Sequence, residues 1–317
     1  MAKAYDRVGW LLTPAGDEER IRNSAETAAD VLVPDLEDGT TYPDEERQTR
    51  EKQHARELLA DIAADGLDGA AFYPRTNALD SPYWEADVQA LVPAGVDGLV
   101  VPMLRSVDRL RGLVERIETL EREAGVEERV GLALMVETPY SRRKAFELAS
   151  VDDRVDALVF GPGDLSVSLG TLRDDEQRLR EVHSVFDPVR LELSSVASEL
   201  GIDAIGGPPS LYSLLTDGSY TPEGYEFEHC NRAARMGMDG KLVLHPSHLG
   251  PVHRGFAPSR AEVEKAQRMV AFREDARERG ERAVTMLDSG EMFVPALVEQ
   301  AEDTLERYEQ LGVREEV

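Results

Sequence analysis

Acidic and glycine residues follow two consecutive apolar runs of the chain, and their types suit metal-assisted chemistry. Glu137 and Thr138 follow one run, and Gly161, Gly163 and Asp164 follow the next. Ionised carboxylates that crowd together repel one another unless a cation compensates their charge. Because Mg²⁺ prefers one or two carboxylates with water and substrate oxygens, we expect Glu137 and Asp164 to bind Mg²⁺, with Mn²⁺ as the alternative ion.

A second group of charged residues follows two earlier apolar runs. Asp35, Glu37 and Asp38 follow one of them, and Arg75 and Asn77 follow the other. A guanidinium at this point can bind a carboxylate or stabilise an enolate oxygen. A salt bridge from Arg75 to Glu37 or Asp38 is the alternative interpretation. The two interpretations are compatible if the carboxylates orient Arg75 toward the substrate.

Several other chemistries fit the sequence poorly. Ser166 stands where the third glycine of a GxGxxG dinucleotide fingerprint would fall, and no GxxxxGK[ST] loop is present. Lys241 begins its apolar run rather than ending it, which disfavours a Schiff-base aldolase. We interpret Cys230 as a buried apolar residue within a helix.

Three histidines near residue 250 raise the question of zinc. The spacing of His245, His248 and His253 matches neither a zinc finger nor an HExxH helix, and no cysteine joins them. We therefore expect His245 to fix a loop, or to support the metal site from behind its ligands, rather than to bind a metal.

The order of the apolar runs predicts the fold. Eight short runs, each bounded by turn residues, alternate with amphipathic stretches such as 107–124 and 174–200. This alternation is typical of strands buried on both faces of a parallel sheet, and eight repeats favour a closed (β/α)8 TIM barrel over a doubly wound open sheet. We expect residues 1–258 to form the barrel and 259–317 a C-terminal helical arm, with helices at 261–279 and 295–311 around a turn at 287–290. The runs are 7–14, 30–38, 69–77, 98–104, 131–139, 157–166, 203–209 and 241–247.

The composition limits the partners and the compartment. The chain has 62 acidic and 36 basic residues, a net charge of −26, and only five lysines. Such a surface disfavours nucleic acid and anionic membranes, and it is typical of an extreme halophile such as a haloarchaeon, in whose cytoplasm molar salt screens surface charges. A single cysteine and no secretory signal or spanning segment predict a cytoplasmic protein.

At the polar residues that follow the apolar runs, the sequence resembles the HpcH/HpaI aldolase and citrate lyase β-subunit (CitE-like) family, specifically its malyl-CoA lyase branch. The resemblance runs from residue 7 to about residue 311. It is carried by PDLEDGT (34–40), RTNALDSPYWEADV (75–88), VETP (136–139), FGPGDLSVSLG (160–170), GMDGKLVLHPSHL (237–249) and FAPS (256–259).

This resemblance implies a Mg²⁺-dependent retro-Claisen or aldol-type lyase. Its substrate would be a 3-hydroxyacyl-CoA such as malyl-CoA or β-methylmalyl-CoA, which gives acetyl- or propionyl-CoA and glyoxylate. The ion on Glu137 and Asp164 would chelate the 2-oxo acid, and Arg75 would stabilise the enolate while Glu37 and Asp38 orient it. The resemblance also implies a homotrimer or homohexamer in which the arm packs on a neighbouring subunit. Substrate contacts would come from Gly163, Leu165, Thr138 and Pro139, and Arg20 would approach the CoA phosphates.

Three positions depart from the family pattern. Met103 replaces a usual lysine, Gly206 replaces an aspartate, and Val294 replaces the aspartate of a C-terminal Gly-x-Met-x-Asp motif. Asp288 or Glu291 would have to take over as acid or base. These departures leave three alternatives open, namely a thioesterase of malyl-CoA-type thioesters, a CoA-independent 2-oxo-acid aldolase, and a non-catalytic ligand-binding or assembly protein that kept the fold and lost its acid or base.

Overall fold

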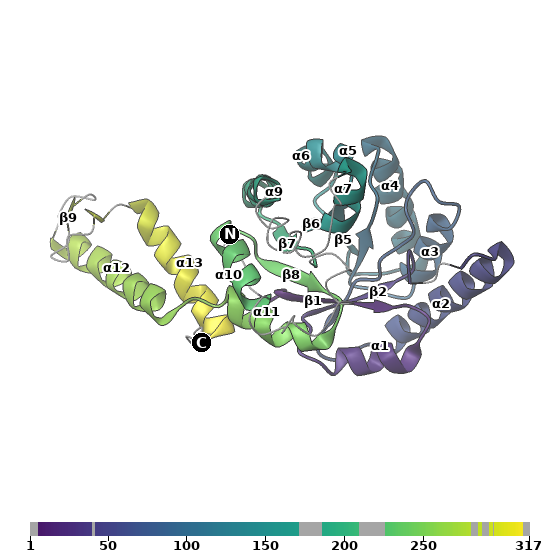
Figure 1. The fold of residues 1–317 in the computed structure, drawn as a ribbon, viewed down its shortest axis with the longest axis horizontal. Helices are drawn as coiled ribbons and strands as arrows, with labels where there is room; N and C mark the ends of the chain where they lie inside the picture. Colours follow the sequence, from purple (N-terminus) through teal and green to yellow (C-terminus); the bar gives the residue numbers. More distant parts are fainter. Residues whose placement is uncertain are drawn as a thin grey trace.

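The protein folds around eight parallel strands that form a nearly closed barrel surrounded by helices (Figure 1). The computed structural model describes residues 6–39, 42–170, 186–208, 226–279, 285–286, 292–293 and 295–312. The strand order is β3-β2-β1-β8-β7-β6-β5-β4, and each strand overlaps one of the eight predicted runs. The strands are β1 (Gly9–Pro14), β2 (Val31–Asp35), β3 (Ala71–Phe72), β4 (Gly98–Val101), β5 (Gly131–Val136), β6 (Val155–Phe160), β7 (Asp203–Gly206) and β8 (Gly240–Val243).

The barrel closes between β3 and β4 through single backbone bridges rather than a regular ladder. Strand β3 is much shorter than the predicted run, because Pro74 has no N–H to donate. The Pro74 carbonyl still accepts from the N–H of Val100, and the N–H of Thr76 donates to the carbonyl of Val100, both at 3.0 Å. Arg75 forms parallel bridges to Asp35 on one side and to Val100 on the other.

Alternating residues of each strand fill the barrel interior. Trp10, Val31, Val33, Met135 and other inward residues form one buried cluster, and their chain neighbours pack outward against the helices. This two-residue period follows from strand geometry, which sends successive side chains to opposite faces. The inward positions therefore lead directly to the residues at the barrel mouth.

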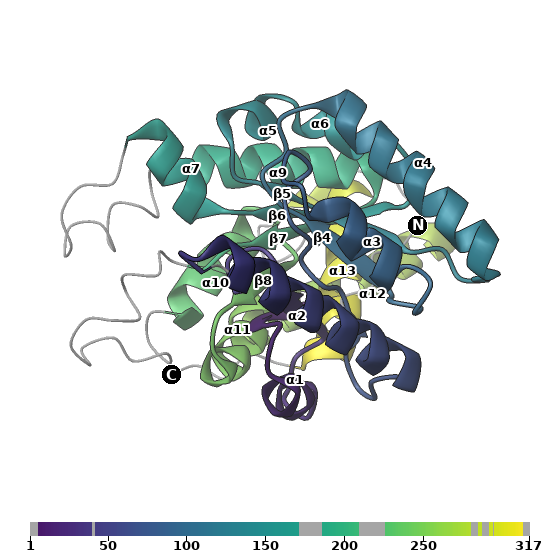
Figure 2. The same cartoon turned by 90° about the vertical axis from the view of Figure 1, so that its right-hand side faces the viewer.

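Amphipathic helices cover the outside of the barrel (Figure 2). Helix α4 has the predicted bounds: the Ser106 side chain accepts from the N–H of Arg109 at its start, and Gly125 adopts a left-handed conformation at its end. Of the predicted helix 174–200, residues 187–200 form α9, and 174–185 lie outside the described residues. The helices of the barrel are α1 (Glu18–Ala25), α2 (Glu45–Asp65), α3 (Trp84–Leu91), α4 (Val107–Ala124), α5 (Pro139–Arg143), α6 (Ala145–Ala149), α7 (Pro162–Leu169), α9 (Asp187–Leu200), α10 (Phe227–Arg235), the 3₁₀ helix η3 (Pro246–His248) and α11 (Leu249–Phe256).

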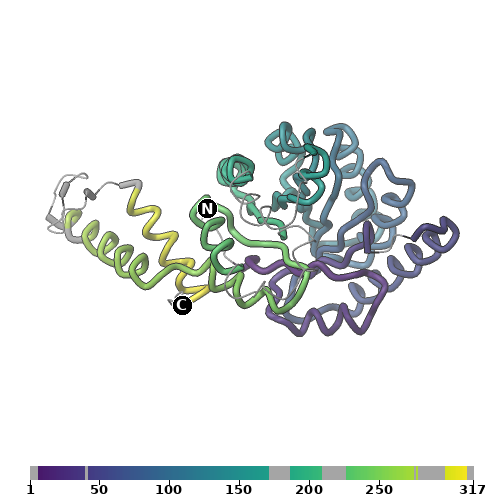
Figure 3. Tube along the Cα trace, in the orientation of Figure 1, coloured from purple at the N-terminus to yellow at the C-terminus, as the bar shows by residue number. Residues whose placement is uncertain are grey.

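Two further helices extend away from the barrel, as the Cα trace in Figure 3 shows. Helices α12 (Arg260–Arg279) and α13 (Pro295–Leu311) pack on each other around a small cluster of buried residues. Strands β9 (Thr285–Met286) and β10 (Met292–Phe293) pair between them. The predicted turn at 287–290, which includes Asp288, lies outside the described residues, as do Glu291 and Val294. No described helix combines the length and apolar character needed to cross a membrane.

Candidate metal centre

The inward register of the strands places the charged residues in the barrel mouth. Val31 and Val33 of β2 face the barrel interior. The next residue of the same parity, Asp35, therefore faces the barrel mouth. The same step leads from Tyr73 to Arg75, and from Met135 on β5 to Glu137. The C-terminal ends of strands form the active sites of barrels of this type.

Arg75 lies at the centre of this group and is almost fully buried. Its Nε and Nη2 donate to the two carboxylate oxygens of Asp35, each at 2.7 Å. Its Nη1 lies 3.1 Å from Oε2 of Glu37, and Nη2 lies 3.3 Å from Oδ2 of Asp38. The predicted salt bridges of Arg75 to Glu37 and Asp38 are therefore present. Asp35 supplies the bidentate contact that fixes the plane of the guanidinium.

The charge on this arginine is stabilised by its carboxylate partners. Burial opposes ionisation of both Arg75 and Asp35. The ion pair outweighs burial, because Arg75 lowers the pKa of Asp35 while Asp35 raises the pKa of Arg75. The N–H groups of Glu37 and Gly39 also donate to the Asp35 carboxylate, at 3.0 and 2.9 Å. Asp35 and Arg75 are thus a charged pair at neutral pH.

Glu137 projects into the mouth from the end of β5 and is 1% exposed. Its Oε1 accepts from the N–H of Met103 at 2.6 Å, and Met103 has a positive φ of 52° that no other described non-glycine residue shares. Its Oε2 is buried and has no hydrogen-bond partner among the described residues. Gly161 makes room for the carboxylate, because a Cβ there would lie 2.5 Å from Glu137 Oε2.

Three carboxyl groups of the mouth are more basic than usual. Burial raises the pKa of Glu37 to about 8 and that of Glu137 to about 7, and the neighbouring carboxylates contribute although Arg75 opposes them. Asp164 is exposed, yet partial loss of hydration and the charge of Asp38 raise its pKa as well. The single guanidinium does not compensate all of the negative charge gathered in the mouth.

These features fit a divalent cation. A hard ion with a preference for oxygen ligands matches the donor set of Glu137 and Asp164, and Glu137 Oε2 is a buried carboxylate oxygen to which no described residue donates. The charge of Asp164 is among the influences that raise the pKa of Glu137, which places the two groups in one electrostatic environment. A cation here would reverse those pKa shifts by favouring the ionised forms.

The start of α7 provides backbone donors beside Asp164. Pro162 occupies the first helical position, and the N–H groups of Gly163 and Asp164 have no acceptor within the helix. A Cβ on Gly163 would meet nothing within 4 Å, so its backbone is open. The N–H of Leu165 is already committed to the carbonyl of Gly161 at 3.3 Å, and the Leu165 side chain is buried. Gly163 is thus the better placed of the two predicted substrate contacts on α7.

The other predicted substrate contacts shape the turn after β5. The Thr138 hydroxyl donates to the carbonyl of Leu104 at 2.8 Å and accepts from the N–H of Ser141, which completes a capping box at the start of α5. Pro139 follows as an exposed first residue of that helix. Thr138 therefore holds the end of β5, and with it Glu137, in place.

Arg20 lies apart from this centre, in a cavity of about 500 Å³ beside the ends of β1 and β8. Its side chain is 60% exposed and approaches Asp17 at 3.9 Å. His245 lines the same cavity, and its Nδ1 accepts from the N–H of Ser247 at 3.2 Å. His245 thus fixes its loop, as the sequence predicted.

Two further histidines and the cysteine lie near carboxylates in the described part of the chain. His253 pairs with Asp30 at 2.8 Å. His248 pairs at 3.1 Å with Glu226, outside the barrel. Glu226, His229 and Cys230 lie close enough together to share a metal ion, but the Lys241 ammonium forms a salt bridge with Glu226 and lies 2.7 Å from Nδ1 of His229. Cys230 is a buried residue of α10, as predicted.

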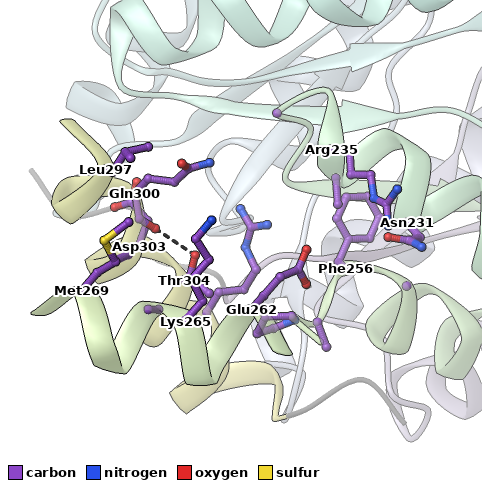
Figure 4. Close-up of a pocket in the computed structure, with 18 residues that line it drawn as sticks. Asn231, Arg235, Phe256, Glu262, Lys265, Met269, Leu297, Gln300, Asp303 and Thr304 are labelled. Atoms are coloured by element: carbon purple, nitrogen blue, oxygen red, sulfur yellow. Dashed lines mark hydrogen bonds between the residues drawn. The ribbon is translucent and has the colours of Figure 1, made fainter. Parts of the chain in front are cut away.

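A second cavity of about 500 Å³ lies between α10 and α11 of the barrel and the two arm helices (Figure 4). Lys265 and Glu262 of α12 face it together with Asp303 of α13, and Arg235 and Phe256 contribute from the barrel side. Both charge signs are represented, and the cavity lies away from the mouth residues. The carboxylate cluster in the mouth is therefore the candidate site.

The model of the HpcH/HpaI aldolase/citrate lyase family matches residues 10–246, which span the strands and the whole carboxylate cluster. The chain belongs to this family. Citrate lyase subunit beta of Escherichia coli is 27% identical to it over 317 residues, covering 99% of this chain and 97% of the relative. A (3S)-malyl-CoA thioesterase of Cereibacter sphaeroides is 28% identical over 310 residues, covering 95% and 94%.

A solved structure resembles the fold of this chain. The CitE protein of Mycobacterium tuberculosis, in complex with magnesium, acetoacetate and coenzyme A, superposes with a TM-score of 0.70 at 25% identity. The match covers 95% of this chain and 97% of that protein. Family members named citrate lyase are lyases, and this structural relative holds magnesium.

Two parts of the candidate site in the present chain do not follow from its sequence analysis. The sequence places Asp35 after an apolar run but assigns it no role. The inward parity of Val31 and Val33 identifies it as the residue that faces Arg75. The hydrogen bond from the Met103 N–H to Glu137 could not be predicted from the sequence, because a backbone donor does not depend on side-chain type. Only the positive φ of that residue marks it.

Proposed function

We propose that this protein is a Mg²⁺-dependent carbon-carbon lyase of the malyl-CoA lyase type. It would cleave or form a 3-hydroxyacyl-CoA such as malyl-CoA or β-methylmalyl-CoA, with acetyl- or propionyl-CoA and glyoxylate as the other partners. The observation that carries the proposal is the buried Glu137 carboxylate, one oxygen of which has no donor among the described residues. This carboxylate is coupled electrostatically to Asp164 and lies beside the paired Arg75.

In this proposal each mouth residue has a defined task. Glu137 and Asp164 would hold the Mg²⁺ ion, which supplies Lewis-acid polarisation of the 2-oxo acid oxygens. Cleavage of malyl-CoA would transfer the hydroxyl proton to a base, break the adjacent C–C bond and leave its electron pair on the thioester enolate, whose carbon then accepts a proton. Arg75, held by Asp35 and oriented by Glu37 and Asp38, would stabilise that enolate oxygen until carbon is protonated.

The remaining contacts extend the same proposal. The N–H of Gly163 would donate to the 2-oxo acid carboxylate at the N-terminus of α7, a position that favours anions. Thr138, Pro139 and Leu165 would form the adjoining wall of the site. Arg20 would approach the CoA phosphates from the cavity beside β1.

A second candidate function is hydrolysis of the same thioesters. It is favoured by the 28% identity to a protein named (3S)-malyl-CoA thioesterase. Val294, which stands where the branch has an acid or base, fits a changed final step. A CoA-independent 2-oxo-acid aldolase is the third option, supported by the acidic residues Asp17 and Glu19 around Arg20.

One assay separates these functions. The protein is incubated with malyl-CoA and Mg²⁺ in molar KCl, and glyoxylate phenylhydrazone and free thiol are followed in the same sample. Glyoxylate with acetyl-CoA, absent in Asp164→Ala, supports the lyase. Free thiol without glyoxylate identifies the thioesterase, and silence in both channels directs the search to CoA-free 2-oxo acid substrates.

We further propose a cytoplasmic homotrimer or homohexamer adapted to high salt, in which the arm at 259–317 packs on a neighbouring barrel. The projection of α12 and α13 away from the barrel supports this arrangement, since two paired helices bury little apolar surface alone. Light scattering of the whole protein and of a chain truncated after residue 258, both in molar KCl, tests it. A truncated chain that keeps the oligomer would contradict the role of the arm.

A further inference from the structure

A lysine lies buried directly beneath the loop that carries Glu37 and Asp38. Lys52 belongs to α2 and is 2% exposed. Its ammonium donates to the carbonyl of Leu36 at 2.5 Å and to the carbonyl of Glu37 at 3.0 Å. Both of these acceptors are backbone carbonyls, so Lys52 bears on where the loop runs.

The same ammonium reaches the loop after β3. It donates to Oδ1 of Asn77 at 2.7 Å, two residues beyond Arg75. Asn77 is in turn fixed by Asp87 of α3, whose carboxylate accepts from its N–H at 2.9 Å and its Nδ2 at 2.6 Å. Arg56 of α2 pairs with Asp87 at 3.0 Å. One buried network therefore joins the two loops whose side chains meet at the guanidinium.

The position of Lys52 on its helix makes this contact unusual. Buried Ala55, Leu59 and Ile62 continue the face of α2 on which Lys52 lies, at spacings of three and four residues. An apolar side chain would suit that stripe. A buried ammonium instead requires hydrogen-bond acceptors to offset the loss of hydration, and here the acceptors belong to the two loops of the site.

We propose that Lys52 is a positioning residue of the site, one that fixes the backbone of Leu36 and Glu37 against Asn77 and so aims Glu37 and Asp38 at Arg75. The inference rests on the proposed function for its effect on turnover. Its effect on metal affinity is independent of the reaction, because the charge of Asp38 bears on both Glu137 and Asp164.

The charge and the positioning of Lys52 have opposite effects on Mg²⁺ affinity. If the ammonium acted only through its charge, its removal would make the mouth more negative and strengthen cation binding. If it acts by positioning, its removal lets Asp38 and Glu37 shift away and weakens binding. Partners behind the ligands of a metal site typically change affinity or activity by about 10- to 100-fold.

The test compares Lys52→Met with Lys52→Gln, which keeps an N–H donor without the charge. Mg²⁺ affinity is measured by calorimetry in molar KCl, and kcat and KM are measured with malyl-CoA. Lys52→Met should bind Mg²⁺ about tenfold more weakly and lose about tenfold or more in kcat with KM little changed. Lys52→Gln should recover part of both losses, and it carries the test if Lys52→Met does not fold.

Lys241→Met provides the matched control. Lys241 is also a buried lysine, paired with Glu226 outside the barrel, so its loss should lower thermal stability without changing Mg²⁺ affinity. Unchanged or tighter Mg²⁺ binding in folded Lys52→Met overturns the proposal, and so does equal weakening in Lys241→Met. If wild-type protein turns over no thioester, the calorimetry still decides the role of Lys52 while the proposed function alone fails.

Discussion

Replacement of Glu137 by glutamine should stabilise the metal-free protein while it abolishes Mg²⁺ binding. Glutamine keeps the shape of the side chain, and its amide oxygen can accept from the Met103 N–H that now donates to Oε1. The change removes a buried negative charge whose second oxygen has no donor among the described residues. An uncompensated buried charge costs more than a neutral group of the same shape.

The size of the effect follows from the pKa of Glu137, which burial raises from an ordinary 4.5 to about 7. The folded protein therefore binds more protons than the unfolded chain between these pH values, so stability falls as pH rises through this window. Each pKa unit corresponds to about 1.4 kcal/mol. Ionised Glu137 should thus lower the stability of the metal-free protein by about 3 kcal/mol at pH 8.

Urea unfolding followed by circular dichroism, at pH 5 and pH 8 in constant KCl with EDTA, measures this difference. Glu137→Gln should exceed wild type by about 3 kcal/mol at pH 8 and by less than about 1 kcal/mol at pH 5. Replacing EDTA with Mg²⁺ should stabilise wild type only. A variant less stable than wild type at pH 8, or an equal difference at both pH values, would refute the reasoning.

Glu121→Gln is a control of opposite sign. Burial also acts on Glu121, but its hydrogen bonds from Arg154 and from the N–H of Val130 outweigh burial and lower its pKa. Loss of that ionised group should destabilise the protein at pH 8, where Glu137→Gln stabilises it. Two glutamate-to-glutamine changes with opposite outcomes would show that environment, and not residue type, determines the result.

Two further substitutions test the geometry of the mouth. Arg75→Met should lower the free energy of unfolding by roughly 3–5 kcal/mol at neutral pH, because it leaves the buried Asp35 carboxylate without its partner; a loss below about 1 kcal/mol in urea unfolding would contradict that pairing. Gly161→Ala should weaken Mg²⁺ binding about tenfold in calorimetry, since its Cβ would lie 2.5 Å from Glu137 Oε2. Gly163→Ala, with nothing within 4 Å of the new Cβ, should bind Mg²⁺ normally, and equal weakening in both variants would show that the clash is not the cause.

The sequence by itself determined the barrel and the positions of its mouth residues. Each of the eight predicted runs contains most or all of one strand, and the bounds of α4 were predicted without error. These features follow from local patterns, namely apolar periodicity and capping residues at helix ends. The prediction that Glu137 and Asp164 bind a metal rests on the same kind of pattern, because a strand end is a local feature with a known place in a barrel.

Two features that the sequence analysis did not predict, the inward position of Asp35 and the burial of Lys52, do have a local sequence pattern. The parity of Val31, Val33 and Asp35 places the third in the mouth, and Lys52 stands at the start of the buried apolar stripe of α2. A lysine in such a stripe usually extends its ammonium to solvent, so the pattern alone favours an ordinary surface lysine. Its acceptors lie 15, 16 and 25 residues away in the chain.

The tertiary structure alone decided how the charges compensate one another. Asp35 rather than Glu37 holds Arg75 in two bonds, the Met103 N–H reaches Glu137, and Gly161 leaves the space that Glu137 Oε2 occupies. Each of these contacts joins two different strand ends. Sequence periodicity shows which side chains enter the mouth, but pairing and pKa depend on distances and on exclusion of water, and only the closed barrel sets those.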